Sequence, residues 1–453
     1  MKFCVPRTLL GAWLIVGSWG LVAPAQAQEP GKSVALALAE ALQDRQAAPD
    51  VRIAAARTLQ RLPAEQAAEA VGALTAALAD PVYAVRESAA LALAKLGQRA
   101  EPAIPALTRL LTDRDEAVKS AAVAGLSAIG PKAKEALPAV LALAKNQSAP
   151  QRPAALAALG AFGQADAAVL EVLLAGLDDT PEVVQTATAA LARLGAPAVE
   201  PLLQLLQTSP KQAVRERTAA ALAKIGEPAV AALLAQLAAP SDTGRADAQR
   251  HLLAQTLAKI GKPALTGLTA AAKDAAHPGQ LLAVEALGWL GADAAESLLG
   301  LSNEPQLPPA VLQRTIAALA LAGVGNQAVG QRLLQLVESE DVRLRREAVA
   351  ALGATKTTEA VSKLAELAKA DTQPLPVRLA AVRSLGQLGE SAKEALPTLR
   401  ELASGQGDNA LRQYAVVALA GLGGAEVEAI LLPLTRDPDN GVRRAAIEGL
   451  APR

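Results

Sequence analysis

The sequence is poor in the residues on which most enzymes and disulfide-stabilised proteins depend. It holds one cysteine, one methionine, two histidines and only 2% aromatic residues among 453. Such low aromatic content is unusual for an enzyme, because pocket walls commonly carry Phe, Tyr and Trp. Lys plus Arg equals Asp plus Glu at 44 each, so no overall positive charge favours nucleic acid as a partner.

The residues of a catalytic or metal site are also missing. Metal sites need clustered His, Cys or carboxylates, and nucleophilic triads need a base beside Ser or Cys. His251 and His277 stand apart from any HxxxH or His-Glu motif. We therefore predict no catalytic, cofactor-binding or metal-ligating residues and no cofactor, and we predict that the protein is not an enzyme.

The first 27 residues have the pattern of a secretory signal peptide. Lys2 and Arg7 precede an apolar stretch, 9–22, that is too short for a comfortable membrane span. A small-x-small motif ending at Ala27 predicts cleavage after that residue. The chain is therefore expected in the periplasm or outside the cell, with an uncleaved signal anchor as the alternative.

Export would leave a chain without cysteine. Cys4 lies before the apolar stretch rather than at the cleavage site, which argues against a lipoprotein anchor. The mature chain could form no disulfides even in an oxidising compartment, so its stability must come from packing. No further stretch of eighteen apolar residues lacks charge, and we expect no membrane span after the signal peptide.

The remainder of the chain, 28–453, repeats one short helical pattern. Most copies start with Val or Leu, and apolar residues recur 4, 7, 8 and 11 positions later. This is the spacing of an amphipathic helix, and the clearest copies end with Gly at position 12, which fits a left-handed helix cap. Thirteen start positions, 30 to 35 residues apart and each numbered 0 in its copy, are Val51, Val85, Val118, Gln151, Val183, Val214, Gln249, Gly279, Val311, Leu344, Val377, Leu411 and Val442.

A second helical segment lies between successive copies. One such pair cannot bury its own apolar stripe, so neighbouring pairs must stack into a continuous core. We predict an all-α, right-handed α-solenoid of about thirteen helix pairs, with an N-terminal capping unit at 28–62 and a C-terminal one at 424–453. The joints at 268–280 and 301–309 make copies seven to nine the most irregular.

At these residues the chain resembles HEAT repeats, in particular the short variety found in phycobilin-lyase-like bacterial proteins. The resemblance depends on an acidic turn, on Val-Arg at the start of the second helix, and on Pro105, Pro138 and Pro397, each eight residues after a glycine. The period is shorter than in long HEAT and armadillo repeats, and the tetratricopeptide and ankyrin signatures are absent. The resemblance implies a protein-binding groove lined by the second helices.

The resemblance also implies an inter-repeat ladder between the turn Asp and a basic residue at position 1 of the second helix. Three copies carry Val184, Gln280 and Leu312 at that position, so the ladder should be interrupted there. The basic residues that match the pattern are Arg52, Arg86, Lys119, Arg152, Arg215, Arg250, Arg345, Arg378, Arg412 and Arg443.

A second basic row lies at position 10 of the second helix. Stacking would bring these side chains onto one ridge, which could bind an acidic partner. Alternatively, each cation complements the helix dipole just before the glycine. The members are Arg61, Lys95, Arg193, Lys224 and Lys259.

Trp289 occupies the same position 10 in copy eight. A lone Trp where other copies carry Lys or Arg should be at least partly exposed, and exposed Trp is a common interface anchor. It could equally fill a gap left by the irregular joints. Together with the basic row, it forms the predicted partner-binding surface.

These features favour a non-catalytic, exported scaffold that binds protein partners through its concave groove, does not bind nucleic acid, and has no membrane span in the mature chain. The first alternative is a structural or assembly component of the cell envelope, whose repeats contact copies of themselves or the wall. The second is a lyase-like enzyme. The sequence leaves the oligomeric state open.

Overall fold

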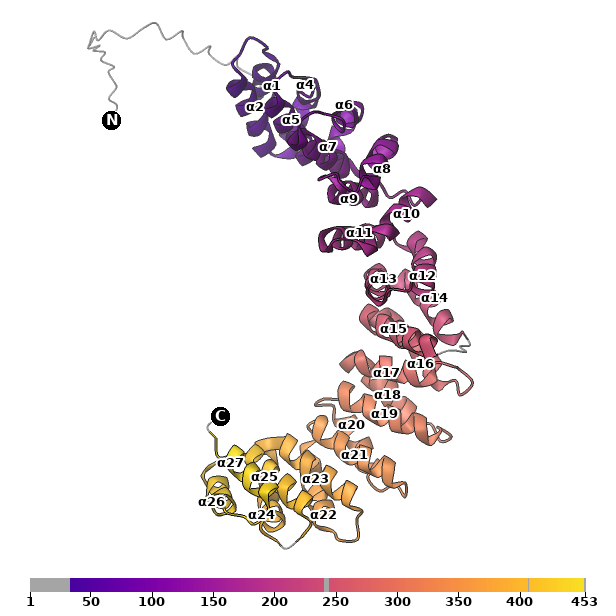
Figure 1. The fold of residues 1–453 in the computed structure, drawn as a ribbon, viewed down its shortest axis with the longest axis vertical. Helices are drawn as coiled ribbons and strands as arrows, with labels where there is room; N and C mark the ends of the chain where they lie inside the picture. Colours follow the sequence, from indigo (N-terminus) through magenta and orange to yellow (C-terminus); the bar gives the residue numbers. More distant parts are fainter. Residues whose placement is uncertain (1–32, 240–243, 406, 452–453) are drawn as a thin grey trace, which may run out of the picture.

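The computed structural model describes residues 33–239, 244–405 and 407–451, and the predicted signal peptide lies outside these residues. Every regular element in the described residues is helical. The helices form thirteen antiparallel pairs stacked along one arc, with α1 (Val34–Gln43) and α27 (Asn440–Gly449) at its opposite ends (Figure 1). The all-α solenoid predicted from the sequence is confirmed.

The helix bounds follow the repeat. The first helices of the pairs are α1 (Val34–Gln43), α4 (Val71–Ala77), α6 (Ile104–Leu110), α8 (Leu137–Lys145), α10 (Ala167–Ala175), α12 (Val199–Thr208), α14 (Glu227–Ala238), α16 (Lys262–Lys273), α18 (Ala295–Ser302), α20 (Gln327–Leu336), α22 (Val361–Lys369), α24 (Leu396–Ser404) and α26 (Ala425–Leu434). The second helices are α2 (Pro49–Arg61), α5 (Tyr83–Leu96), α7 (Glu116–Ile129), α9 (Arg152–Phe162), α11 (Pro181–Leu194), α13 (Gln212–Ile225), α15 (Gly244–Ile260), α17 (Gln280–Trp289), α19 (Pro309–Ala322), α21 (Val342–Ala354), α23 (Leu375–Leu388), α25 (Asn409–Leu422) and α27 (Asn440–Gly449).

Each predicted start position falls at the beginning of a second helix, within two residues of its first residue, except in copy seven. There α15 begins at Gly244, five residues before Gln249. Short segments such as α3 (Ala64–Ala67) and the 3-10 helix η2 (Gly97–Ala103) connect one pair to the next. The predicted prolines lie in the first turn of first helices, as with Pro105 in α6, where the missing N–H leaves no helical hydrogen bond unmade.

The core is one continuous apolar layer between the two rows of helices. In α5 the residues at positions 0, 4, 7 and 8 (Val85, Ala89, Ala92 and Leu93) are all fully buried. Each buried Val or Leu contributes about 1.5–3 kcal/mol relative to an exposed one. The small residues let second helices approach closely: a Cβ at Gly288 of α17 would lie 3.0 Å from the Cα of Ala318 in α19.

The glycine that closes most second helices differs from the expected left-handed cap. Gly163 has that conformation, with φ 70° and ψ 12°. Gly226 has φ 79° but ψ −135°, a region that only glycine occupies without strain. The same combination occurs at Gly97, Gly130, Gly195, Gly261 and Gly389. The cap prediction is therefore wrong in ψ, although the need for glycine is confirmed.

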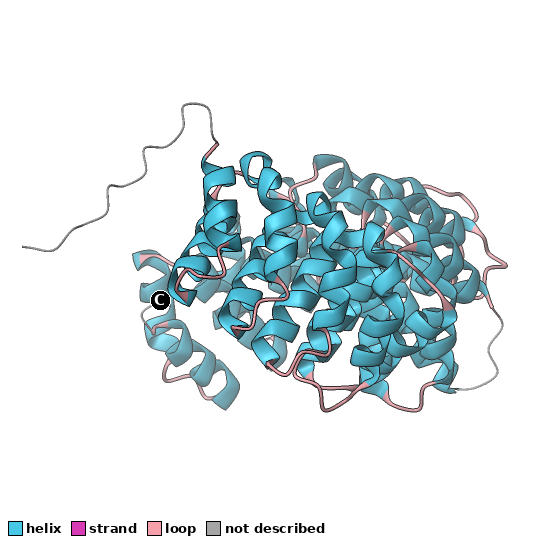
Figure 2. Ribbon diagram, turned by 90° about the horizontal axis from the view of Figure 1, so that it is seen from above, coloured by secondary structure: helices cyan, strands magenta, loops and turns pink. Residues whose placement is uncertain are grey.

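The second helices line the inner, concave side of the arc and the first helices its outer side (Figure 1). Seen from above, the stacked helices are joined by loops at their ends (Figure 2). Positions 2, 6 and 10 of the second helices point away from the buried layer, so they form the concave surface. None of the described helices is long and apolar enough to cross a membrane.

Candidate partner-binding surface

The ladder of position 1 is present in part. Arg86 Nη2 lies 2.8 Å from Asp113 Oδ1 in the turn of the following repeat, and Arg52 Nε lies 2.9 Å from Asp80. In the same way, Arg152 pairs with Asp179 and Arg412 with Asp437. Arg345 donates to the side-chain oxygen of Gln373, which takes the place of the aspartate.

The other predicted ladder residues contact their own repeat instead. Arg215, Arg250 and Arg443 donate to carbonyls of the turn before their own helix, and Arg378 pairs with Asp371 of that turn. Lys119 pairs with Glu116 one helical turn away. The ladder prediction is therefore wrong for Lys119, Arg250, Arg378 and Arg443. A carboxylate in the next turn is not sufficient, because Asp274 follows Arg250 and Asp408 follows Arg378 without pairing with them. The turn that follows Arg215 includes residues 240–243, which lie outside the described residues.

Where position 1 is not basic, the interruption predicted from the sequence is present. Gln280 keeps only the contact within the repeat, donating to the Ala272 carbonyl at 3.0 Å. Val184 and Leu312 carry no group that could pair. Copies seven to nine thus contain no ladder pair among the described residues.

Ladder arginines change the acidity of their partners. The hydrogen bond from Arg86 holds the pKa of Asp113 below its ordinary value, aided by the backbone N–H of Asp115. Arg152 lowers the pKa of Asp179 in the same way. Both carboxylates therefore stay ionised to lower pH when the chain is folded.

The basic row at position 10 lies in the last turn of five second helices, and all five side chains are exposed. None of them forms an ion pair with a described residue. The row is not continuous, because α7 and α9 carry Ala128 and Ala161 at this position. Arg61 and Lys95 form one pair, whereas Arg193, Lys224 and Lys259 occupy three consecutive helices, α11, α13 and α15.

Trp289 continues that run on α17. Its side chain is 40% exposed, as expected from its position. It also packs, because its ring meets the ring of His251 edge to face with centroids 5.2 Å apart. The next residue along the ridge is Leu321 on α19, which is 60% exposed. Position 10 therefore changes from three cations to two apolar side chains across five neighbouring helices.

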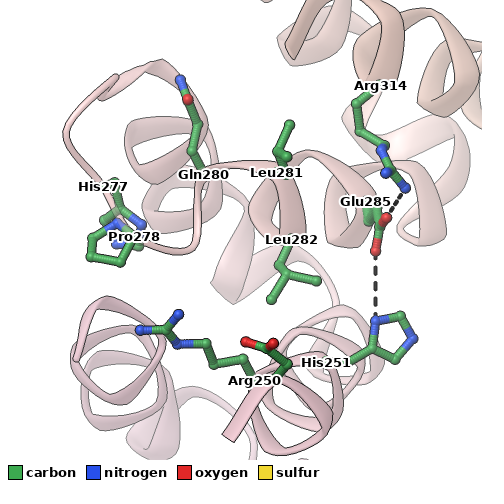
Figure 3. A pocket seen from close by; sticks show the side chains of 10 residues that line it. Arg250, His251, His277, Pro278, Gln280, Leu281, Leu282, Glu285 and Arg314 are labelled. Atoms are coloured by element: carbon green, nitrogen blue, oxygen red, sulfur yellow. Dashed lines mark hydrogen bonds and ion pairs between the residues drawn. The ribbon is translucent and has the colours of Figure 1, made fainter. Parts of the chain in front are cut away.

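A cluster of charged groups from three repeats lies beside Trp289, and Figure 3 shows its members His251, Glu285 and Arg314. Glu285 of α17 is largely buried and forms an ion pair with Arg314 of α19. Its other oxygen lies 3.6 Å from Nδ1 of His251 on α15. One carboxylate thus pairs with α19 and lies beside the histidine of α15 against which Trp289 packs.

Two hollows flank this cluster. One, of about 560 Å³, is lined by His251, Glu285 and Arg314 together with His277 and Leu281 (Figure 3). The other, of about 260 Å³, is lined by Trp289, Leu321 and the same charged residues. The concave surface therefore offers exposed apolar side chains beside concave space, which is the usual form of a binding site.

The cluster was missed in the sequence, because its members lie in three different copies. His251 occupies position 2, Glu285 position 6 and Arg314 position 3, about thirty residues apart in the chain. Aligning the exposed positions of neighbouring copies would have brought them together. No group of three or more His, Cys, Asp or Glu suited to a metal ion occurs in the described part of the chain.

Known proteins share the repeat and the architecture. A family model described as HEAT repeats matches residues 35–127, 104–192, 170–252, 306–376 and 370–451, most of the chain. The similarity to phycobilin-lyase-like members in particular remains a prediction.

Solved structures with similar backbones include the karyopherin Kap121p bound to the extreme C-terminus of the protein phosphatase Cdc14p. It shares 15% identity and a TM-score of 0.42 over 91% of this chain and 53% of that one. Kap121p bound to Ste12p shares 14% and 0.43 over 92% and 53%. A structure concerned with a phosphorylation switch in the interaction between cadherin and beta-catenin shares 14% and 0.32 over 92% and 98%. The chain spans about half the length of the karyopherins it matches.

Proposed function

The chain belongs to the HEAT-repeat family, and on that premise we propose that it is a non-catalytic, exported scaffold that holds a protein segment against its concave face. The proposed contact surface, called the ridge below, consists of Arg193, Lys224, Lys259, Trp289 and Leu321. Export rests on the signal-peptide pattern of residues 1–27. The absence of catalysis rests on the lack of catalytic motifs in the sequence.

The ridge itself carries the proposal. Its five residues occupy the same position on consecutive helices, α11 to α19, and neighbouring helix axes lie about 8–10 Å apart. The ridge is therefore on the order of 40 Å long, the reach of about twelve extended residues. Its three cations favour acidic side chains, and its two apolar residues favour a hydrophobic one. The partner segment is thus expected to be acidic at one end and apolar at the other.

The charged cluster prepares this surface for binding. Glu285 pairs with Arg314 and lies beside His251, and the His251 ring packs edge to face with Trp289. An anchor that is already held in place loses less conformational freedom when a partner binds. A rigid Trp between a cationic run and an exposed Leu fits the role of an interface hot spot.

Affinity capture from a periplasmic extract, followed by calorimetry with the captured partner, tests this proposal. Trp289→Ser combined with Leu321→Ser should weaken binding about tenfold or more, because hot-spot truncation costs more than about 1 kcal/mol. Neutralising Arg193, Lys224 and Lys259 to Ser should weaken binding most at low salt.

The matched controls lie on the same concave face outside the ridge. Val417→Ser removes an exposed apolar residue of α25, and Arg61→Ser with Lys95→Ser removes the other two cations of the row. These controls should leave affinity unchanged. Binding that survives the Trp289 and Leu321 change, or that is lost equally in the controls, would show the ridge to be the wrong surface.

A further inference from the structure

Interior repeats bury one residue of each second helix against the repeat that follows. Position 5 is buried in all of the first twelve copies, at 6% exposure or less. These residues are Ala56, Ala90, Val123, Leu156, Thr188, Ala219, Ala254, Val284, Ile316, Val349, Val382 and Val416. In the last copy the equivalent residue is Ile447, and its side chain is 59% exposed. The C-terminal end of the stack therefore presents an apolar residue where a further repeat would pack.

The N-terminal end shows the complementary exposure. Position 0 is buried in every interior copy except copy seven, as at Val85 and Val118. In the first copy this position is Val51, and it is 47% exposed. Terminal repeats of solenoids ordinarily carry a polar outer face, whereas both ends of this stack expose an apolar residue.

The ladder is incomplete at the same two ends. In an interior repeat, Arg86 Nη1 donates to the Asp80 carbonyl of its own turn, while Nε and Nη2 reach Asp113 of the next turn. Arg443 in the last copy makes the first contact, from Nη1 to the Asp437 carbonyl at 2.9 Å, and its Nη2 donates to Asn440 Oδ1 of its own helix. Its second contact, to the carboxylate of a following turn, has no counterpart in the described residues.

Asp44 is the corresponding carboxylate at the other end. It accepts a hydrogen bond from the backbone N–H of Gln46 at 2.9 Å, in the same turn geometry in which Asp80 accepts one from Val82 at 2.8 Å. Asp80 is paired with the arginine of the preceding repeat, whereas no arginine of the described residues reaches Asp44.

We propose that copies of the chain stack head to tail, so that the first repeat of one copy occupies the place of a fourteenth repeat on another. Ile447 of one copy and Val51 of the next then become buried, and Arg443 pairs with Asp44 across the junction. The two surfaces differ, so the contact is heterologous and propagates into an open superhelical filament or a ring. The proposal does not depend on the ridge.

Sedimentation velocity of the full chain across a range of concentrations tests it. The wild type should form assemblies that grow with concentration. Ile447→Glu and Val51→Glu should each weaken self-association about 100-fold or more, because each buries an unpaired charge in the junction. Each variant still has one intact end, so an equimolar mixture of the two should form dimers and nothing larger.

A charge exchange separates the junction from a general loss of structure. Arg443→Asp and Asp44→Arg should each weaken self-association, and both changes in one chain should restore it. Leu321→Glu, on the concave ridge, is the matched control and should leave assembly unchanged. A wild-type protein that stays monomeric at all concentrations overturns the proposal. So does assembly that persists in the Ile447→Glu variant, or a mixture of the two end variants that grows beyond dimers.

Discussion

Repeats one to four and repeats seven to nine are built on the same pattern but differ in how neighbouring repeats are joined. In the first region Arg52, Arg86 and Arg152 each bind a carboxylate of the next turn. In the second region Arg250 and Gln280 contact only their own repeat, and Leu312 has no polar group to offer. The first region thus uses position 1 for cohesion, and the second does not.

The second region places its charged contacts elsewhere. Glu285, Arg314 and His251 interact on the concave face. At the turns, the exposed Lys273 pairs with Glu304 of the next repeat, which is not a position 1 contact. A cavity of about 500 Å³ lies between Gln280 and the joint residue Gln306, where a ladder pair would otherwise stand. The comparison teaches that a departure from the repeat is more informative about binding than the repeat itself.

The largest expected effect comes from breaking the ladder. Asp113→Ala should lower the free energy of unfolding by about 2–4 kcal/mol, because it leaves Arg86 half-buried without its carboxylate. Asp274 has the same turn hydrogen bond, to the N–H of Ala276, but pairs with no arginine of the described residues. Asp274→Ala should therefore cost less than about 1 kcal/mol. Urea denaturation followed by circular dichroism measures both, and equal losses would abolish the distinction between the two regions.

Lowering the pH should destabilise repeats one to four before repeats seven to nine. The pKa values of Asp113 and Asp179 are lower in the folded chain than in the unfolded one. Their stabilising contribution is therefore complete above the unfolded pKa and is lost as pH falls through the folded pKa. The loss of stability on protonation is smaller than that caused by Asp113→Ala, since a protonated carboxyl still accepts a hydrogen bond from arginine. Hydrogen exchange between pH 5 and pH 3 should show protection falling earlier in α5 and α7 than in α17 and α19, and the reverse order would contradict the assignment.

The smallest expected effect is a gain in the free energy of unfolding. Gln280→Arg together with Gln306→Asp should add a ladder pair across the cavity between copies eight and nine. The expected stabilisation is about 1 kcal/mol, because the pair is only partly buried. Denaturation of the double variant and of each single variant measures the coupling. Strict additivity of the two single changes would mean that no pair forms.

Much of the fold could be predicted from the sequence, because the same spacing recurs thirteen times. Val85 and Leu93 are apolar for the same reason in every copy, so the periodicity alone locates the second helices. The start of α15 was displaced because Gln249 is polar and gives no apolar signal. The ψ of the glycine caps could not be predicted, since a glycine in sequence indicates a positive φ but does not specify which region it occupies.

Less of the candidate binding surface could be predicted from the sequence. The exposure of Trp289 follows from its position, but its contact with His251 depends on how α15 and α17 are placed side by side. Arg378 shows the same limit in the ladder: its residue type fits, yet it pairs with Asp371 of its own turn. Which of two nearby carboxylates an arginine reaches depends on turn geometry that the repeat spacing does not encode. Binding at the ridge and export from the cytoplasm stay predictions.

The missing ladder pairs also have a mechanical consequence. In a stack where each repeat contacts only its neighbours, a force applied at the two ends passes through every junction in series. The junction between copies eight and nine lacks a ladder pair at position 1, and the charged contacts that cross it are the exposed pair Lys273–Glu304 and the concave pair Glu285–Arg314. Exposed ion pairs contribute little cohesion, so this junction is more compliant than one that holds a buried ladder pair. Under tension the solenoid would bend there first, and the same movement would separate Trp289 from Leu321. If the protein is stretched between two attachment points, the applied force would in this way change the shape of its own binding surface.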